Sequence, residues 1–257
     1  MNPETELKKA LLLNYRSGPG MTSSARLYIN PEEAWPYFRA NYEPLIESTP
    51  RSARILEVGC GPGALLAWLR SRGFENLQGI DASPGDVEFA NRALGRALVV
   101  QGDARAFLES RPGEFDLVIM KAFLEHVGKH DLLETVNATA RCLSPKGRAV
   151  IDVPNMDWIL AAHERYMDLT HEVGFTRESL LNLLQLAFSQ VAVKGSVLGF
   201  HTRAQRLWRR ALIGCLRKAF YVLGEGASEV LFECRSIIAV ASLPRGPGFC
   251  LDETAGS

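Results

Sequence analysis

The chain has 257 residues, of which 47% are hydrophobic and 23% charged, and this size and composition suit one α/β domain with additions better than two full domains. Its 29 Lys and Arg residues balance 29 Asp and Glu residues. No overall charge therefore attracts nucleic acid, and we expect no nucleic-acid partner.

Cysteine usage and the amino terminus favour a cytoplasmic location. The five cysteines are scattered, odd in number and never spaced as CxxC, which argues against a disulfide framework or a zinc finger and favours a reducing compartment. The first six residues are polar and acidic, where a signal peptide would be basic and then apolar. No apolar run is long enough to span a bilayer.

The amino-terminal part divides into a lead-in and a helix. Residues 1–30 carry Ser, Gly and Pro punctuation, so we predict a flexible lead-in there. From Pro31 to about Ser48, aromatic and apolar residues recur at three- and four-residue steps, which predicts a helix capped by Asn30.

A regular alternation of short apolar strands and helices follows. The predicted strands are 54–58, 77–80, 97–100, 115–120 and 148–153, and the helices between them are 64–72, 84–94, 104–110 and 130–143. Such an alternation is typical of βαβ crossovers and of a parallel sheet covered on both faces.

The pattern changes after Pro154. Residues 154–175 are polar and predict an active-site insertion, and Thr176 caps a helix. A strand at 191–197, a basic helix at 203–223 and a final strand at 231–243 follow, before a tail at 244–257. We thus expect one α/β domain over 31–243 with a doubly wound, mostly parallel seven-stranded sheet.

The sharpest motif is ILEVGCGPGA at residues 55–64, where a strand leads through three glycines into a helix. Glycines let the backbone turn tightly and approach a ligand that faces the amino end of the helix. The motif alone is weak evidence, because dinucleotide dehydrogenases use a related GxGxxG and a tight turn needs glycine too.

Three acidic residues narrow the choice of ligand. Glu57 lies two residues before the first glycine, where a carboxylate suits an ammonium group better than a pyrophosphate. Asp81 ends the second strand and can accept both hydroxyls of a ribose, and Asp103 follows the third strand, where an adenine amino group would lie. All three lie at carboxyl ends of strands, where open α/β sheets bind ligands.

These features resemble the class I S-adenosylmethionine (SAM)-dependent methyltransferases. The resemblance covers about residues 53–153: the glycine loop, Asp81, Gly102-Asp103, the strand from Phe115 to Leu124-Glu-His-Val127, and Leu143 to Arg148. It implies a Rossmann-like fold and SAM as cofactor. A dehydrogenase is disfavoured because its glycine spacing differs and its phosphate-facing loop would not accommodate Glu57.

The resemblance also implies roles for individual residues. Gly59, Gly61 and Gly63 would line the methionine moiety, and Glu57 would hold the loop or the ammonium group. Asp81 would bind the ribose, while Ala82 and Ser83 would flank the adenine. The remaining residues expected to bind the cofactor are Gly102, Asp103 and Ala104, with Asp103 accepting the adenine amino group, and Lys121 and Ala122, which would lie beneath the sulfonium.

The methyl acceptor is less specified by the residues. Amino-methyltransferases acting on adenine or glutamine carry an Asn/Asp-Pro-Pro-Tyr/Phe motif after the fourth strand, whereas this chain has Met120-Lys-Ala-Phe123. With the neutral net charge, this argues against nucleic acid as the acceptor.

A second resemblance points to sugars. Residues 165–180 (RYMDLTHEVGFTRESL) are similar to a segment of bacterial methyltransferases associated with lipopolysaccharide and other surface glycans. The resemblance implies O-methylation of a sugar hydroxyl in a glycan or its lipid-linked precursor. The alternatives are a methyltransferase acting on a small molecule, such as a natural product or quinone precursor, and a non-catalytic SAM-binding protein.

A hydroxyl acceptor needs a base, and His171 is the leading candidate, with Asp168 or Glu172 to orient its ring. Alternatively, Asp168, Thr170 and His171 hydrogen-bond the insertion to the core. His126 follows the fourth strand, and we favour a structural role for it over a catalytic one. No metal site is expected, because the polar residues of the insertion lack an HExxH motif and nothing places them on one face.

The predicted helix 203–223 carries six Lys or Arg residues and no acid, and its apolar residues repeat every four positions. Such a helix suits a peripheral contact with the inner face of a membrane or a lipid-linked glycan. We favour the alternative in which its apolar stripe covers the sheet or a dimer partner. The oligomeric state is left open.

Overall fold

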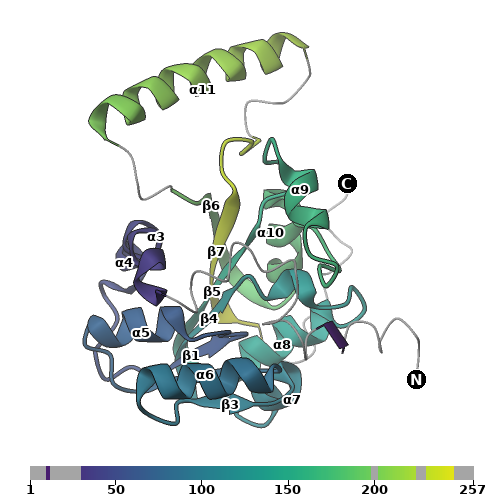
Figure 1. Cartoon of the computed structure of the whole chain (residues 1–257). Helices are drawn as coiled ribbons and strands as arrows, with labels where there is room; N and C mark the ends of the chain where they lie inside the picture. Colours follow the sequence, from purple (N-terminus) through teal and green to yellow (C-terminus); the bar gives the residue numbers. More distant parts are fainter. Residues whose placement is uncertain (1–9, 12–29, 198–201, 224–229, 246–257) are drawn as a thin grey trace, which may run out of the picture.

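A seven-stranded sheet forms the centre of the molecule (Figure 1), with strand order β3-β2-β1-β4-β5-β7-β6. The computed structural model describes residues 10–11, 30–197, 202–223 and 230–245. Strands β1 to β5 pair in parallel, and β7 pairs antiparallel with both β5 and β6. The strands are β1 Ile55–Val58, β2 Leu77–Asp81, β3 Val99–Gln101, β4 Phe115–Lys121, β5 Leu143–Pro154, β6 Phe188–Gly195 and β7 Ser236–Pro244.

The predicted doubly wound, mostly parallel sheet is therefore confirmed. The helices are α3 Trp35–Asn41, α4 Glu43–Ile46, α5 Ala64–Ser71, α6 Pro84–Leu94, α7 Ala104–Glu109, α8 Leu132–Cys142, α9 Ala161–Tyr166, α10 Arg177–Gln185 and α11 Arg203–Leu223, with short 3-10 turns η2 Pro31–Ala34 and η3 Leu124–His126. Apart from residues 10, 11, 30, 244 and 245, the predicted lead-in and tail lie outside the described residues.

Two hydrophobic cores lie on opposite faces of the sheet. One contains buried residues of α3, α5 and α6, such as Phe38, Trp68 and Ala90. The other contains residues of α7, α8 and α10, such as Leu108 and Val136. The strands between them are buried on both faces, which explains why they are continuous apolar runs rather than alternating ones.

The amino-terminal helix is shorter than predicted. Asn30 caps its first turn as expected, with Oδ1 accepting a hydrogen bond from the backbone N–H of Glu32 at 3.1 Å. The segment is nevertheless divided into η2, α3 and α4. Pro44 lacks the N–H that a continuous helix needs at that position, so the helix breaks at Tyr42.

Several strand boundaries also differ from the prediction. β6 spans Phe188–Gly195 rather than 191–197, and β3 spans Val99–Gln101 rather than 97–100. β5 begins at Leu143, because Leu143 pairs with Phe115 of β4 across a register shift before the regular ladder resumes. β7 begins at Ser236 rather than at 231, because the N–H of Cys234 bonds to the carbonyl of Leu231 and closes a turn there.

Asn155 ties the start of the predicted insertion to the segment before β7. Its side chain is fully buried and donates hydrogen bonds to the carbonyls of Leu231 and Cys234 at 2.7 and 2.9 Å. The insertion returns to Asn155 at Phe175, which pairs with it in an isolated bridge and is buried in the core. The two ends of the insertion are thus held together at Asn155, whose side chain also holds the segment before β7.

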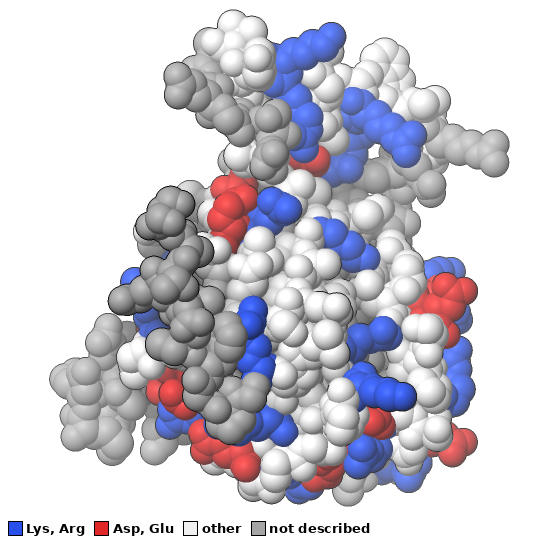
Figure 2. Space-filling model, turned by 180° about the vertical axis from the view of Figure 1, so that it is seen from behind, with Lys and Arg blue, Asp and Glu red and all other residues white. Residues whose placement is uncertain are grey.

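Helix α11 lies apart from the sheet (Figure 1), so the predicted packing of its apolar stripe on the sheet is wrong, while packing on a dimer partner stays a prediction. Its residues Leu207, Trp208 and Leu212 are 61–78% exposed. Figure 2 shows Lys and Arg side chains gathered on this helix at the top of the molecule. In the part of the chain that the structure describes, every helix is too short or too polar to cross a bilayer.

We expect replacement of Asn155 by Ala to lower the free energy of unfolding by about 2–3 kcal/mol, because two buried carbonyls would lose their donor. Urea denaturation measures this change. Asn76→Ala is the matched control, since Asn76 makes one comparable bond to the carbonyl of Ser52 in an exposed loop. Equal effects of the two substitutions would show that Asn155 is not an anchor.

Candidate functional site

The glycine loop between β1 and α5 forms an open cradle at the carboxyl edge of the sheet. Gly59, Gly61 and Gly63 all have positive φ angles, of 68°, 49° and 77°, which other residues rarely adopt. A side chain at Gly59 would also collide with Phe123, whereas nothing lies within 4 Å of a Cβ placed on Gly61. The loop thus leaves open space above Gly61 for a ligand.

Asp81 connects this loop to the end of β2. Its Oδ2 accepts a hydrogen bond from the N–H of Gly61 and its Oδ1 accepts one from the N–H of Ser83, both at 2.8 Å. Burial raises the pKa of this carboxyl above its usual value. Each oxygen keeps a second lone pair, so Asp81 can order the loop and still accept bonds from a ribose.

The other residues expected around the adenosine lie along the same edge. Ser83 is buried and caps α6, so the exposed Ala82 is the one that can contact a ligand directly. Asp103 is exposed and caps α7 through Oδ1, next to Gly102 and Ala104 at the end of β3. The arrangement fits the adenosyl group of SAM, with one acid at the end of β2 and another just after the neighbouring β3.

Three buried carboxyl groups surround Lys121 at the end of β4. Glu57, Glu125 and Asp152 are at most 3% exposed. Burial raises the pKa of all three, to about 8 for Glu57 and for Glu125, while the charge of Lys121 acts in the opposite direction on each. The next residue, Ala122, has a φ of 50°, a strained conformation for a residue with a Cβ.

Asp152 is held by two tyrosines that we did not predict to be functional. Its Oδ2 accepts hydrogen bonds from the hydroxyls of Tyr37 and Tyr42 at 2.9 and 2.8 Å. Burial, reinforced by the nearby Asp152 carboxylate, raises the pKa of both hydroxyls, so both remain donors. An aspartate inside the apolar run of β5 was the available sequence signal.

The two candidate catalytic histidines lie together, although they are 45 positions apart. The ring centroids of His126 and His171 are 4.8 Å apart. Nδ1 of His126 bonds to the hydroxyl of Thr170 at 2.8 Å, and that hydroxyl donates to Oδ1 of Asp168 at 2.6 Å. Nδ1 of His171 bonds to the carbonyl of Glu164 at 2.8 Å.

The partners thus differ from those expected. The carbonyl of Glu164, rather than a carboxylate, orients the ring of His171, and Asp168 acts on His126 through Thr170. These bonds also attach the insertion to the core. The same residues can therefore serve both the structural role and a role in the site.

Glu125 completes this cluster and was not predicted from the sequence. Among the described residues neither of its buried side-chain oxygens has a hydrogen-bond partner. Its carbonyl accepts hydrogen bonds from the N–H groups of Glu172 and Val173, at 2.7 and 3.1 Å, which fixes the insertion against η3. The Glu-His pair in LEHV was the signal, but only the fold shows that His171 joins it.

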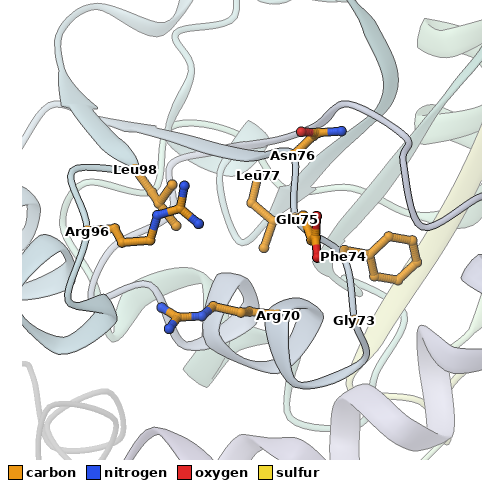
Figure 3. A pocket seen from close by; sticks show the side chains of 8 residues that line it. All are labelled: Arg70, Gly73, Phe74, Glu75, Asn76, Leu77, Arg96 and Leu98. Carbon is orange, nitrogen blue, oxygen red and sulfur yellow. The ribbon is translucent and has the colours of Figure 1, made fainter.

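A separate hollow of about 490 Å³ lies at the opposite edge of the sheet, near the amino ends of β2 and β3. Figure 3 shows Arg70 and Arg96 beside it, together with Leu77 and Leu98. None of the predicted site residues lines this hollow, so it is not part of the candidate site.

Comparison with known proteins identifies the family to which the chain belongs. A family model described as a methyltransferase domain matches residues 32–187. The ubiquinone biosynthesis O-methyltransferase of Xylella fastidiosa is 34% identical over 108 residues, which are 40% of this chain and 42% of that protein. The chain spans less than half the length of this and the other curated relatives that it matches.

Solved structures share the fold at lower identity. A SAM-dependent methyltransferase from Archaeoglobus fulgidus aligns with a TM-score of 0.57 and 21% identity, over 92% of this chain and 99% of that one. The plantazolicin methyltransferase BpumL, solved with S-adenosylhomocysteine, aligns with a TM-score of 0.57 and 19% identity, over 93% and 96% of the two chains.

The raised pKa of Glu57 predicts a pH-dependent stability of the ligand-free protein. The folded protein binds the proton of this carboxyl up to its raised pKa of about 8, whereas the unfolded chain releases it near the ordinary glutamate pKa of 4.5. The stability contributed by protonation is therefore fully present below 4.5 and is lost as the pH rises to 8.

Replacing Glu57 by Gln removes this titration and leaves Glu125 in place. We expect the unfolding free energy of the variant, relative to that of the wild type, to rise by a few kcal/mol between pH 5 and pH 9. Urea denaturation across this range measures the difference. A difference that stays constant with pH would contradict the assignment.

Proposed function

The chain belongs to the methyltransferase-domain family, and on this premise we propose that it transfers a methyl group from SAM to a hydroxyl of a surface glycan or of its lipid-linked precursor. One observation carries the proposal: the glycine loop, Asp81 and Asp103 lie at the same sheet edge as the cluster of Glu125, His126 and His171.

Different residues at this edge would bind different parts of the cofactor. Gly59, Gly61 and Gly63 would line the methionine moiety, and Asp81 and Asp103 would hold the ribose and the adenine. The buried carboxyl group of Glu57 would face the cationic end of the molecule, whose charge favours the ionised form of this group. SAM supplies a methyl group on a sulfonium, so the protein has mainly to position the acceptor in line with it.

The acceptor hydroxyl must lose its proton during transfer, and the histidine cluster suits that task. Nδ1 of His171 donates to a carbonyl, so Nε2 is the nitrogen that can accept a proton. The chain from Asp168 through Thr170 orients His126 in the same way. Either imidazole can act as the general base in this proposal.

Helix α11 supports an acceptor at a membrane surface. Arg217 pairs with Glu233 at 2.8 Å, and the ring of Phe220 contacts that of Phe232. Glu233 and Phe232 belong to the segment before β7. In the same segment Arg235 pairs with Glu164, whose carbonyl accepts a hydrogen bond from His171. The basic helix and the candidate site therefore share one end of the molecule, as a lipid-linked acceptor with phosphate groups would require.

A small-molecule acceptor is the second candidate. The observation in its favour is the similarity of residues in this chain to a ubiquinone biosynthesis O-methyltransferase. A non-catalytic role in SAM binding is the third, but the histidine and carboxylate cluster would then have no task beside the cofactor.

We predict that methyl label from SAM enters the lipid-linked or polysaccharide fraction of a host extract. His171→Ala is expected to leave SAM affinity unchanged and to slow transfer about 10²–10⁴-fold. Asp81→Ala is expected to weaken SAM binding about tenfold or more in calorimetry, because two charge-assisted bonds are lost. Asp116→Asn, at the amino end of β4, is the control for both measurements.

Label among small metabolites would favour the second candidate. No transfer into any fraction, with SAM still bound, would favour the third. Unchanged SAM affinity in Asp81→Ala would contradict the ribose assignment.

The proposed membrane contact predicts that the protein sediments with vesicles of phosphatidylcholine and phosphatidylglycerol at low salt, and that salt reduces this binding. Trp208→Ser with Leu212→Ser should abolish it, because both side chains are exposed on α11. Leu133→Ser, at an exposed position of α8, is the control. Absence of sedimentation at low salt would refute the contact.

A further inference from the structure

We propose that Glu125, His126 and His171 bind one divalent transition-metal ion, such as Zn²⁺ or Fe²⁺. Each of the three offers one ligand atom, and these atoms all lie within 4.8 Å of one another. Donors about 2.1 Å from a tetrahedral ion are about 3.4 Å apart, so small side-chain rotations complete the site. The described part of the structure contains no other such group of three.

The hydrogen bonds of the two imidazoles prepare them as ligands. The carbonyl of Glu164 accepts from Nδ1 of His171, so that ring carries its proton on Nδ1 and its lone pair on Nε2. Because the hydroxyl of Thr170 donates to Asp168, it accepts from Nδ1 of His126, which has the same tautomer. Metal-bound histidines have second partners of this kind.

The carboxyl group of Glu125 supplies the second argument. It is 2% exposed, and neither side-chain oxygen has a hydrogen-bond partner among the described residues. Buried polar groups are almost always satisfied, so two carboxyl oxygens without partners beside two imidazole lone pairs fit a site for a cation. A divalent cation among the three groups would fill that site.

The backbone holds the three ligands in place without the ion. The carbonyl of Glu125 accepts from the N–H groups of Glu172 and Val173, which positions His171 beside η3. Arg165 donates to the carbonyls of His171 and Glu172 and fixes the same segment from the other side. The ligands therefore lie on two short, cross-connected segments, which is the preorganisation that a metal site needs.

The donor set indicates the class of ion and its role. Two imidazoles and one carboxylate suit Zn²⁺ or Fe²⁺ and leave coordination positions open. A hydroxyl bound there loses its proton more readily, because the cation stabilises the alkoxide. This role rests on the proposed function: the alkoxide oxygen forms a bond to the methyl carbon as the carbon–sulfur bond of SAM breaks, and the proton leaves to solvent. The histidines are then ligands, not bases.

Metal binding to the full chain tests the proposal without SAM or acceptor. After chelation and dialysis, calorimetry with Zn²⁺ should give one site per chain. The spectrum with Co²⁺ should lack the intense thiolate-to-cobalt band that a cysteine site would produce. We expect Glu125→Gln, which keeps the side-chain volume, to weaken Zn²⁺ binding at least about tenfold, and Thr170→Val to weaken it about 10–100-fold.

His163→Ala is the matched control, because this exposed histidine of α9 belongs to the same insertion but not to the cluster. Absence of stoichiometric binding, or affinities unchanged in Glu125→Gln and Thr170→Val, would overturn the metal site. Methyl transfer by metal-free protein would overturn only the activating role and leave the proposed function standing. Metal binding without methyl transfer would confirm the site and count against the proposed function.

Discussion

The burial of three carboxyl groups at the carboxyl edge of the sheet is the constraint on which the rest of the structure depends. Glu57, Glu125 and Asp152 are withdrawn from water around one lysine, an arrangement that costs free energy unless each group is protonated or its charge is compensated. Two tyrosines compensate Asp152, whereas Glu57 and Glu125 keep oxygens without partners among the described residues. The folded chain thus keeps its unsatisfied buried carboxyl oxygens at the place where cationic ligands would bind, and such ligands would compensate them.

Local pattern accounts for the part of the fold that could be predicted. Apolar strands alternate with helices from 55 to 153, and the glycines and acids expected to bind the cofactor lie at or just after the ends of strands. Their position on the sheet edge therefore follows from topology alone. Asp81 illustrates this, because its place at the end of β2 determines that it faces the glycine loop. The helix caps of Asn30 and Thr176 are equally local and were found for the same reason.

Contacts between distant segments account for what could not be predicted. The hydroxyl of Tyr37 reaches Asp152 across 115 positions, and Thr170 reaches His126 across 44. No periodicity encodes such pairs, because they depend on how the insertion folds back over η3. Helix α11 shows the opposite case. Its apolar residues do repeat at the helical period, but the period does not predict which surface, if any, packs against them.

The position of α11 within the chain has an evolutionary consequence. The helix lies in the connection between two adjacent antiparallel strands, whose mouth is closed by hydrogen bonds between Ser196 and Ser236 in both directions. The strands keep their register whatever joins them, and lengthening a closed loop costs little free energy. This connection is therefore a site where descendants of one ancestor can gain, exchange or lose a docking element by insertion and deletion, while the cofactor-facing edge stays under separate selection.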